Sequence, residues 1–216
     1  NAFVQAIQQK SVVALATENL AQYDRLLGMS GERFKAGDIA QVDLDRLELD
    51  LQPLDIVPLI QRTLESFIPQ AVNSELRFFV AGIQIQLGTK QPVNLPVISI
   101  RGDESQIEQM VANLLSNAIR YSPHGGPITV TLQKKEDNVV ELSVQDSGIG
   151  IPAEALTHLT ERFYRAENAR YVSGQGLGLG LYLINELARR HGGHLSIESK
   201  GIGQGSTFRI TFVEWQ

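Results

Sequence analysis

Two asparagines and an arginine lie along one side of a segment that reads as a helix. Asn113, Asn117 and Arg120 are three or four residues apart, so their side chains share one helical face. Asparagine disfavours a helix interior, because its amide competes for backbone hydrogen bonds. Amide oxygens bind Mg²⁺, and amide N–H groups and arginine donate to phosphate. The spacing is typical of a nucleotide-phosphate site or, alternatively, of a solvated polar face.

An aspartate ends an expected strand and is followed at once by two glycines. Asp146 precedes Gly148 and Gly150, and glycine permits positive φ and close approach of the backbone to a flat ligand. A carboxylate fixed at a strand end can accept a hydrogen bond from an amino group such as adenine N6. A hydrogen bond to a charged group contributes about 1.5–3 kcal/mol. A simple strand-ending turn is the other interpretation.

Two further glycine-rich segments follow. Gly174, Gly176, Leu177 and Gly178 run straight into an expected helix, and N–H groups at such a helix start bind phosphate. The pattern lacks the preceding strand of a dinucleotide-binding fingerprint. The polar residues 164–173 before it read as a mobile loop, which we interpret as a lid. Thr207 lies at a turn into the last expected strand, where its hydroxyl can meet a ligand or simply belong to a hairpin.

The elements that must position these residues follow from hydrophobic periodicity. It predicts helices over residues 1–30, 54–67, 103–121 and 177–191, and strands over 47–51, 77–87, 97–101, 128–135, 139–146, 194–199 and 207–214. Asp103 is the expected N-cap of the third helix, with Gln106 in capping-box position. The order is mixed, which indicates an α+β, two-layer α/β sandwich with helices on one face of a mixed sheet. We expect a helix and linker in residues 1–50 and a catalytic domain in residues 51–216.

Composition excludes several classes of protein. The net charge of −5 argues against a nucleic-acid-binding surface, and the absence of cysteine excludes disulfides and thiolate metal sites. No run of about 18 apolar residues exists, so any membrane attachment is expected outside this sequence. Residues 1–30 repeat Ala6, Val13, Leu20 and Leu27 at seven-residue spacing, so the helix needs a partner helix, from another segment or a second copy.

Five short motifs, in order, resemble those of sensor histidine kinases. Residues 113–123 resemble the N box, 146–152 the G1 box, 161–165 the F box, 174–181 the G2 box and 203–208 the trailing glycine motif. The resemblance implies the sandwich fold shared with gyrase-type and chaperone ATPases. It implies that ATP is bound with Mg²⁺ on Asn113, phosphates at Asn117 and Arg120, and Tyr121 lining the pocket. It further implies adenine at Asp146 and near Thr207, a pocket shaped by Gly148 and Gly150, and a phosphate loop at Gly174, Gly176, Leu177 and Gly178.

The implied activity is transfer of the ATP γ-phosphate to a histidine and then to a response regulator. The resemblance also implies a cytoplasmic homodimer that pairs through the N-terminal helix. The histidines of the chain, His124, His158, His191 and His194, all follow the N box and none begins a His-Glu motif. We therefore expect the acceptor histidine outside this sequence, with residues 1–30 resembling the second helix of the family's dimerising hairpin.

One departure from gyrase-like relatives bears on the chemistry. Those relatives carry a glutamate base four residues before the first N-box asparagine, where this chain has Gln109. Glu108 points about 100° away on a helix. Poor ATP hydrolysis and phosphotransfer to a protein would follow. Two alternatives stay open: a catalytically silent ATP-binding signalling module, and a chaperone- or gyrase-type ATPase.

Overall fold

The computed structural model describes residues 51–88, 96–172 and 177–215 of the chain. The chain divides into two units, 1–50 and 51–216, and the described residues belong to the second. The expected N-terminal helix, with its heptad repeat, and most of the strand expected over residues 47–51 lie outside the described residues.

A six-stranded mixed sheet forms the centre of the second unit. Its strands lie in the order β3-β2-β5-β6-β8-β7. They are β2 (Ser74–Val80), β3 (Ile83–Ile85), β5 (Gly126–Lys134), β6 (Val139–Asp146), β7 (Leu195–Glu198) and β8 (Ser206–Val213). The pair β2–β5 is parallel and the other neighbours are antiparallel. A separate two-stranded sheet pairs β1 (Gln52–Asp55) with β4 (Ser99–Gly102).

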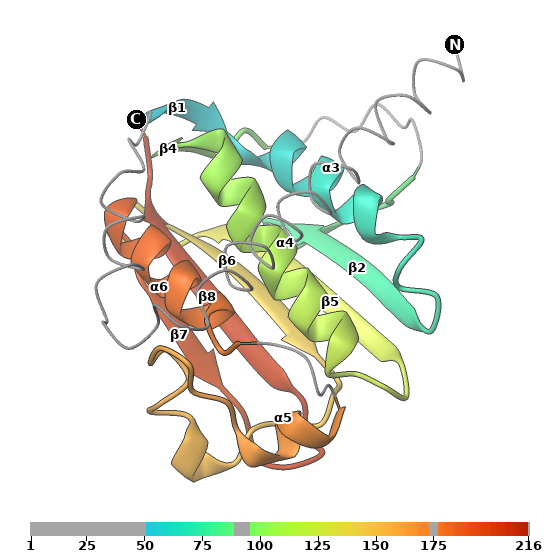
Figure 1. Ribbon diagram of the computed structural model, residues 1–216. Coiled ribbons are helices and arrows are strands. Elements are labelled where there is room, and N and C mark those ends of the chain that lie inside the picture. Colours follow the sequence, from blue (N-terminus) through green and yellow to red (C-terminus); the bar gives the residue numbers. More distant parts are fainter. Residues whose placement is uncertain (1–50, 89–95, 173–176, 216) are drawn as a thin grey trace, which may run out of the picture. The chain divides into compact units, whose positions relative to one another are not determined.

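Three helices cover one face of the large sheet (Figure 1). They are α3 (Ile56–Phe67), α4 (Glu104–Arg120) and α6 (Gly180–Arg190). The buried stripe of α4, which includes Ile107, Met110, Val111 and Leu114, joins alternate residues of β5, β6 and β8 in one hydrophobic core. The predicted two-layer sandwich is confirmed. No helix among the described residues is long and apolar enough to cross a membrane.

Several predicted element bounds differ from the structure. The strand expected over residues 77–87 is a hairpin, because the chain turns at Ala81 and Gly82, both with positive φ. The stretch expected to be a loop over residues 164–173 contains the short helix α5 (Glu167–Val172), and a 3₁₀ turn, η1 (Ala153–Ala155), precedes it. Short helices of this kind carry too few apolar residues for periodicity to reveal them.

The N-terminus of α4 is capped partly as predicted. Asp103 is the N-cap, and its Oδ1 accepts from Gln106 N–H at 3.1 Å. The reciprocal bond of a capping box is absent, because Asp103 N–H donates to His191 Nε2 at 3.1 Å. The Gln106 side chain is instead buried and its Oε1 has no hydrogen-bond partner. Gln106 therefore does not continue the polar face of Asn113 and Asn117.

Candidate functional site

The Asp146 carboxyl group is buried at the last position of β6. The residue is 6% exposed, and no lysine or arginine of the described residues pairs with it. Gly148 N–H donates to its Oδ1 at 2.8 Å, and Ser206 N–H also donates to the carboxylate. Burial raises the pKa of Asp146 to about 6, against the opposing effect of these two N–H groups. A buried carboxylate without a cation is costly for a fold, and such groups cluster at functional sites.

The glycine turn after Asp146 is held by a second turn, residues 199–205, that leads into β8. Gly203 N–H donates to Ile149 O at 2.7 Å and Gly205 N–H to Gly148 O at 3.2 Å. Gly150 has φ +64, and a Cβ there would lie 2.0 Å from Gly201 O. Both the backbone conformation and the close approach exclude a side chain at Gly150. The backbone of the G1 segment is therefore held in one conformation beside the buried Asp146 carboxylate.

The C-terminal end of α4 is bonded to the same segment. Tyr121 is the C-cap of α4, and its carbonyl accepts from Ile149 N–H at 2.9 Å. A Cβ at Gly148 would lie 2.1 Å from this carbonyl oxygen, so the approach requires glycine. The helix that carries the two asparagines thus ends directly against the turn that follows Asp146.

Asn113 and Asn117 are partly exposed on α4, one turn apart. Among the described residues neither side-chain amide has a hydrogen-bond partner. Arg120, in the last turn of α4, is exposed. Two amides and a guanidinium on a surface that ends beside Asp146 can contact a ligand that extends away from the carboxylate.

A third region consists of the F box and the helix α5 that follows it, and it bonds to both the G1 turn and the residues just before α6. Asn168 Nδ2 in α5 donates to Gly150 O at 2.8 Å. Phe163 has φ +65, and its N–H donates to Gly178 O at 3.1 Å. A Cβ at Gly178 would lie 2.7 Å from the carbonyl carbon of Phe163. The start of the segment that enters α6 is therefore bonded to the F box, and α5, which follows the F box, is bonded to the G1 turn.

Arg162 adds a side-chain link to the same contact. Its Nη2 donates to the Tyr182 hydroxyl at 2.6 Å, and its guanidinium lies 4.7 Å from the centre of the Tyr182 ring. Tyr182 is in the first turn of α6. Leu177, just before Gly178, is exposed. Gly174 and Gly176 lie outside the described residues.

The placement of Thr207 corrects the sequence interpretation. Asp146 lies opposite Ser206 in the β6–β8 register, and Thr207 lies opposite Gln145. Successive side chains of a strand point to opposite faces, so Thr207 lies on the face of the sheet away from Asp146. Ser206, which is 8% exposed, shares the buried face with Phe208. The alternation of Ser206 with Phe208, Ile210 and Phe212 is the signal that identifies it.

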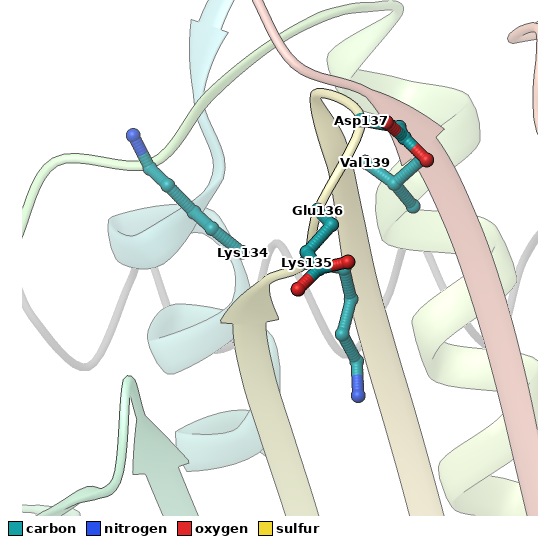
Figure 2. Close-up of a pocket in the computed structure, with 5 residues that line it drawn as sticks. All are labelled: Lys134, Lys135, Glu136, Asp137 and Val139. Carbon is teal, nitrogen blue, oxygen red and sulfur yellow. The ribbon is translucent and has the colours of Figure 1, made fainter.

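A hollow in the structure lies elsewhere. It is lined by Lys134, Lys135, Glu136, Asp137 and Val139 (Figure 2). Val139 begins β6 and Asp146 ends it, so the two places are about 23 Å apart at 3.3 Å per strand residue. This hollow surrounds an exposed turn and lacks all the predicted site residues.

The donor set fits a metal ion only when a nucleotide supplies most of the ligands. Among the described residues no group of three or more His, Asp or Glu side chains is placed to hold a metal ion. Asn113 offers one amide oxygen, which suits Mg²⁺. Mg²⁺ is commonly held by one or two protein groups together with substrate phosphates, so a Mg·nucleotide is compatible with this site.

Residues 102–216 match the family described as histidine kinase-, DNA gyrase B- and HSP90-like ATPase. The chain belongs to this ATPase family. The sensor-like histidine kinase SenX3 of Mycolicibacterium smegmatis is 32% identical over 205 residues, which cover 95% of this chain and 49% of SenX3. The sensor histidine kinase YkoH of Bacillus subtilis is 36% identical over 168 residues, covering 78% of this chain and 33% of YkoH.

Solved structures of this ATPase family share the fold. A mycobacterial sensor histidine kinase, MprB, superposes with a TM-score of 0.63 at 28% identity, covering 76% of this chain and 98% of that chain. Full-length ShkA in complex with AMPPNP gives a TM-score of 0.59 at 26% identity, covering 78% of this chain and 32% of ShkA. The chain therefore contains a histidine-kinase catalytic ATP-binding domain. It spans about half the length of SenX3 and a smaller share of YkoH.

Proposed function

We propose that this chain is the ATP-binding catalytic part of a protein histidine kinase in a two-component system. The observation that carries the proposal is the buried Asp146 carboxylate at the junction of α4, the G1 turn and the 199–205 turn, where no cation from the described part of the chain pairs with it. The ionised carboxylate can accept a hydrogen bond from the adenine amino group and thereby gains the partner that burial denies it.

The remaining predicted residues follow from that anchor. With adenine at Asp146 and Gly148–Gly150, the phosphates extend along α4 toward Asn113, Asn117 and Arg120. Asn113 supplies an oxygen to Mg²⁺, which neutralises phosphate charge when it is bound. Tyr121, Leu177 and Gly178 line the path, and Ser206 takes the adenine-side place predicted for Thr207. The phosphate-loop roles of Gly174 and Gly176 stay a prediction from the sequence.

The proposed chemistry is displacement at the γ-phosphorus. A histidine ring nitrogen attacks, the P–O bond to the β-phosphate breaks, a P–N bond forms, and ADP leaves with the electron pair of the broken bond. Catalysis of this kind rests on positioning and charge neutralisation. The phosphate then moves to an aspartate of a response regulator. In this proposal the chain acts as a cytoplasmic homodimer that pairs through the helix predicted from the sequence over residues 1–30.

None of the four histidines of the described domain begins a His-Glu motif, and one of them, His191, is closed off by burial and two hydrogen bonds. His191 is 4% exposed; its Nδ1 bonds Leu187 O at 2.7 Å and its Nε2 accepts from Asp103 N–H at 3.1 Å. Burial lowers the pKa of His191. His158 Nδ1 bonds Glu161 and His194 Nδ1 bonds Thr211. We propose that the acceptor histidine lies on a separate helix of the kinase.

Two measurements test the proposal. Calorimetry with Mg·ATP and Mg·GTP should show binding of ATP and much weaker binding of GTP, whose ring presents a carbonyl oxygen where adenine has its amino group. The parent kinase with γ-labelled ATP should then acquire label that survives alkali and is lost in acid, as phosphohistidine is. Binding of ATP without any labelled protein would instead identify a silent ATP-binding signalling module, and rapid ATP turnover would identify a gyrase- or chaperone-type ATPase.

A further inference from the structure

The hydroxyl of Ser199 bonds to both turns that surround Asp146. Ser199 directly follows β7, and its Oγ accepts from Ile151 N–H at 3.0 Å. The same hydroxyl donates to Gly205 O at 2.7 Å. Neither bond belongs to a strand ladder, so this single side chain joins the end of the G1 segment to the end of the 199–205 turn.

The bond to Ile151 completes a ladder between the two turns. Backbone N–H groups of the second turn bond Gly148 O and Ile149 O, at 3.2 and 2.7 Å. At the third step the hydroxyl of Ser199 takes the place of a backbone carbonyl. Gly150 is thereby enclosed, with Gly201 O only 2.0 Å from the position of a Cβ.

The bond to Gly205 reaches the other side of the carboxylate. Gly205 packs against the Asp146 backbone, since a Cβ there would lie 2.2 Å from Asp146 O. The next N–H along the chain, that of Ser206, donates to the Asp146 carboxylate. Gly148, whose carbonyl oxygen accepts in the ladder, donates its N–H to Oδ1 at 2.8 Å. The Ser199 hydroxyl thus bonds Gly205, which directly precedes Ser206, and Ile151, which lies three residues after Gly148. Ser206 N–H and Gly148 N–H are the two groups that hold the carboxylate.

We infer that Ser199 is a positioning residue for nucleotide binding: it fixes the two N–H donors that orient the Asp146 carboxylate toward adenine. This inference rests on the proposed function, because the carboxylate matters only if Asp146 reads the base. Ser199 itself need not touch the nucleotide. Because Ser199 acts through Asp146, its effect on nucleotide binding should depend on the presence of the Asp146 carboxylate. The effect of a residue that merely stabilises the fold would not depend on that carboxylate.

The test is a double-mutant cycle measured as Mg·ATP affinity of the whole 216-residue chain. Ser199→Ala should weaken binding about tenfold, and in an Asp146→Asn background the same change should cost less than about threefold, because coupled residues are not additive. Ser199→Thr retains the hydroxyl and should bind within about threefold of wild type. Ser196→Ala, in β7 opposite Arg209, is the matched control and should bind as wild type does.

Each outcome has one reading. Unchanged affinity in Ser199→Ala, or an equal loss in both backgrounds, would overturn the inference while leaving the kinase proposal intact. If Ser199→Ala does not fold, Ser199→Thr decides, and a folded Thr variant that has lost affinity would overturn it. Wild-type chain that fails to bind Mg·ATP would refute the proposed function instead.

Discussion

Both ends of β6 lead into tight turns with charged residues, but the charges of one turn are exposed and the carboxylate of the other is buried. At the Val139 end, Asp137 and Asn138 have positive φ, Lys134 pairs with Glu214, and Lys135 pairs with Glu141 at 3.2 Å. All the charged side chains of this turn are exposed to solvent. At the other end Asp146 is buried, and its partners within the described ranges are two backbone N–H groups. Solvation and ion pairing account for the charges at the first end, whereas the buried carboxylate at the second end is where we propose that adenine binds.

The largest effect expected from this comparison is on nucleotide affinity. Asp146→Asn should weaken Mg·ATP binding roughly tenfold to a hundredfold, because a charged hydrogen bond to the amino group is lost. Asp137→Asn makes the same chemical change in the exposed turn and should leave binding unaltered. Calorimetry on both variants measures the difference. Equal affinities for Asp146→Asn and wild type would remove Asp146 from the adenine role.

A substitution at Gly150 should break the same end through the backbone. Gly150→Ala places a Cβ 2.0 Å from Gly201 O at φ +64, so it should destabilise the domain by roughly 2–4 kcal/mol and abolish tight binding. Gly203→Ala also has positive φ, but its Cβ would meet no atom within 4 Å. It should cost only about 1 kcal/mol. Denaturant unfolding of the two variants compares them, and similar losses would show that the close approach is unimportant.

The buried, ionised carboxylate of Asp146 should lower the stability of the domain while it strengthens Mg·ATP binding. The pKa of Asp146 is raised from 3.8 to about 6, so the stability that protonation gives is present at low pH and is lost as pH rises through about 6. Above that pH, Asp146→Asn should therefore be more stable than wild type by roughly 1–3 kcal/mol. Urea unfolding at pH 8 measures the gain. A variant less stable than wild type at that pH would mean that burial does not strain the carboxylate.

Nucleotide binding should follow the same titration in the opposite sense. The ionised carboxylate accepts the adenine amino group, so Mg·ATP affinity should fall as pH drops below about 6, by about tenfold per pH unit once the group is protonated. The Asp146→Asn variant reports the titration of ATP itself in the same buffers and should lack this additional fall. Parallel pH profiles for the two proteins would contradict the assignment.

The smallest effect is expected at the Val139 end. Lys135→Ala removes an ion pair whose lysine side chain is 46% exposed, so it should change the free energy of unfolding by about 0–1 kcal/mol, and less in high salt. It should leave Mg·ATP affinity unchanged. A marked loss of affinity would shift attention to the hollow in Figure 2.

The sequence predicts the sandwich and much of the site because each depends on local pattern. The stripe of α4 from Ile107 to Leu115, the strand ending at Asp146 and the glycines after it all appear at their expected places. Register is different, because it depends on which residues face each other across two strands. The motif made Thr207 the candidate, and the pairing of Asp146 with Ser206 shows that Thr207 lies on the other face.

Other features depend on contacts that are distant in the sequence. Ser199 bonds Ile151, 48 positions away, and His191 replaces the expected capping-box partner of Asp103, 88 positions away. No periodicity encodes such pairs. Asn168 on α5, which bonds Gly150 O, was equally hidden, because it lies in a stretch whose polarity indicated only a loop.

The central claim is that one Mg·ATP joins the end of α4 to the Asp146 end of β6. The most direct test is amide NMR of the isotope-labelled chain during titration with Mg·AMPPNP. The account predicts the largest shifts at Asn117, Tyr121, Gly148 and Ser206, with the 134–139 turn unaffected. Shifts centred on the 134–139 turn, or absent from Gly148 and Ser206, would contradict it.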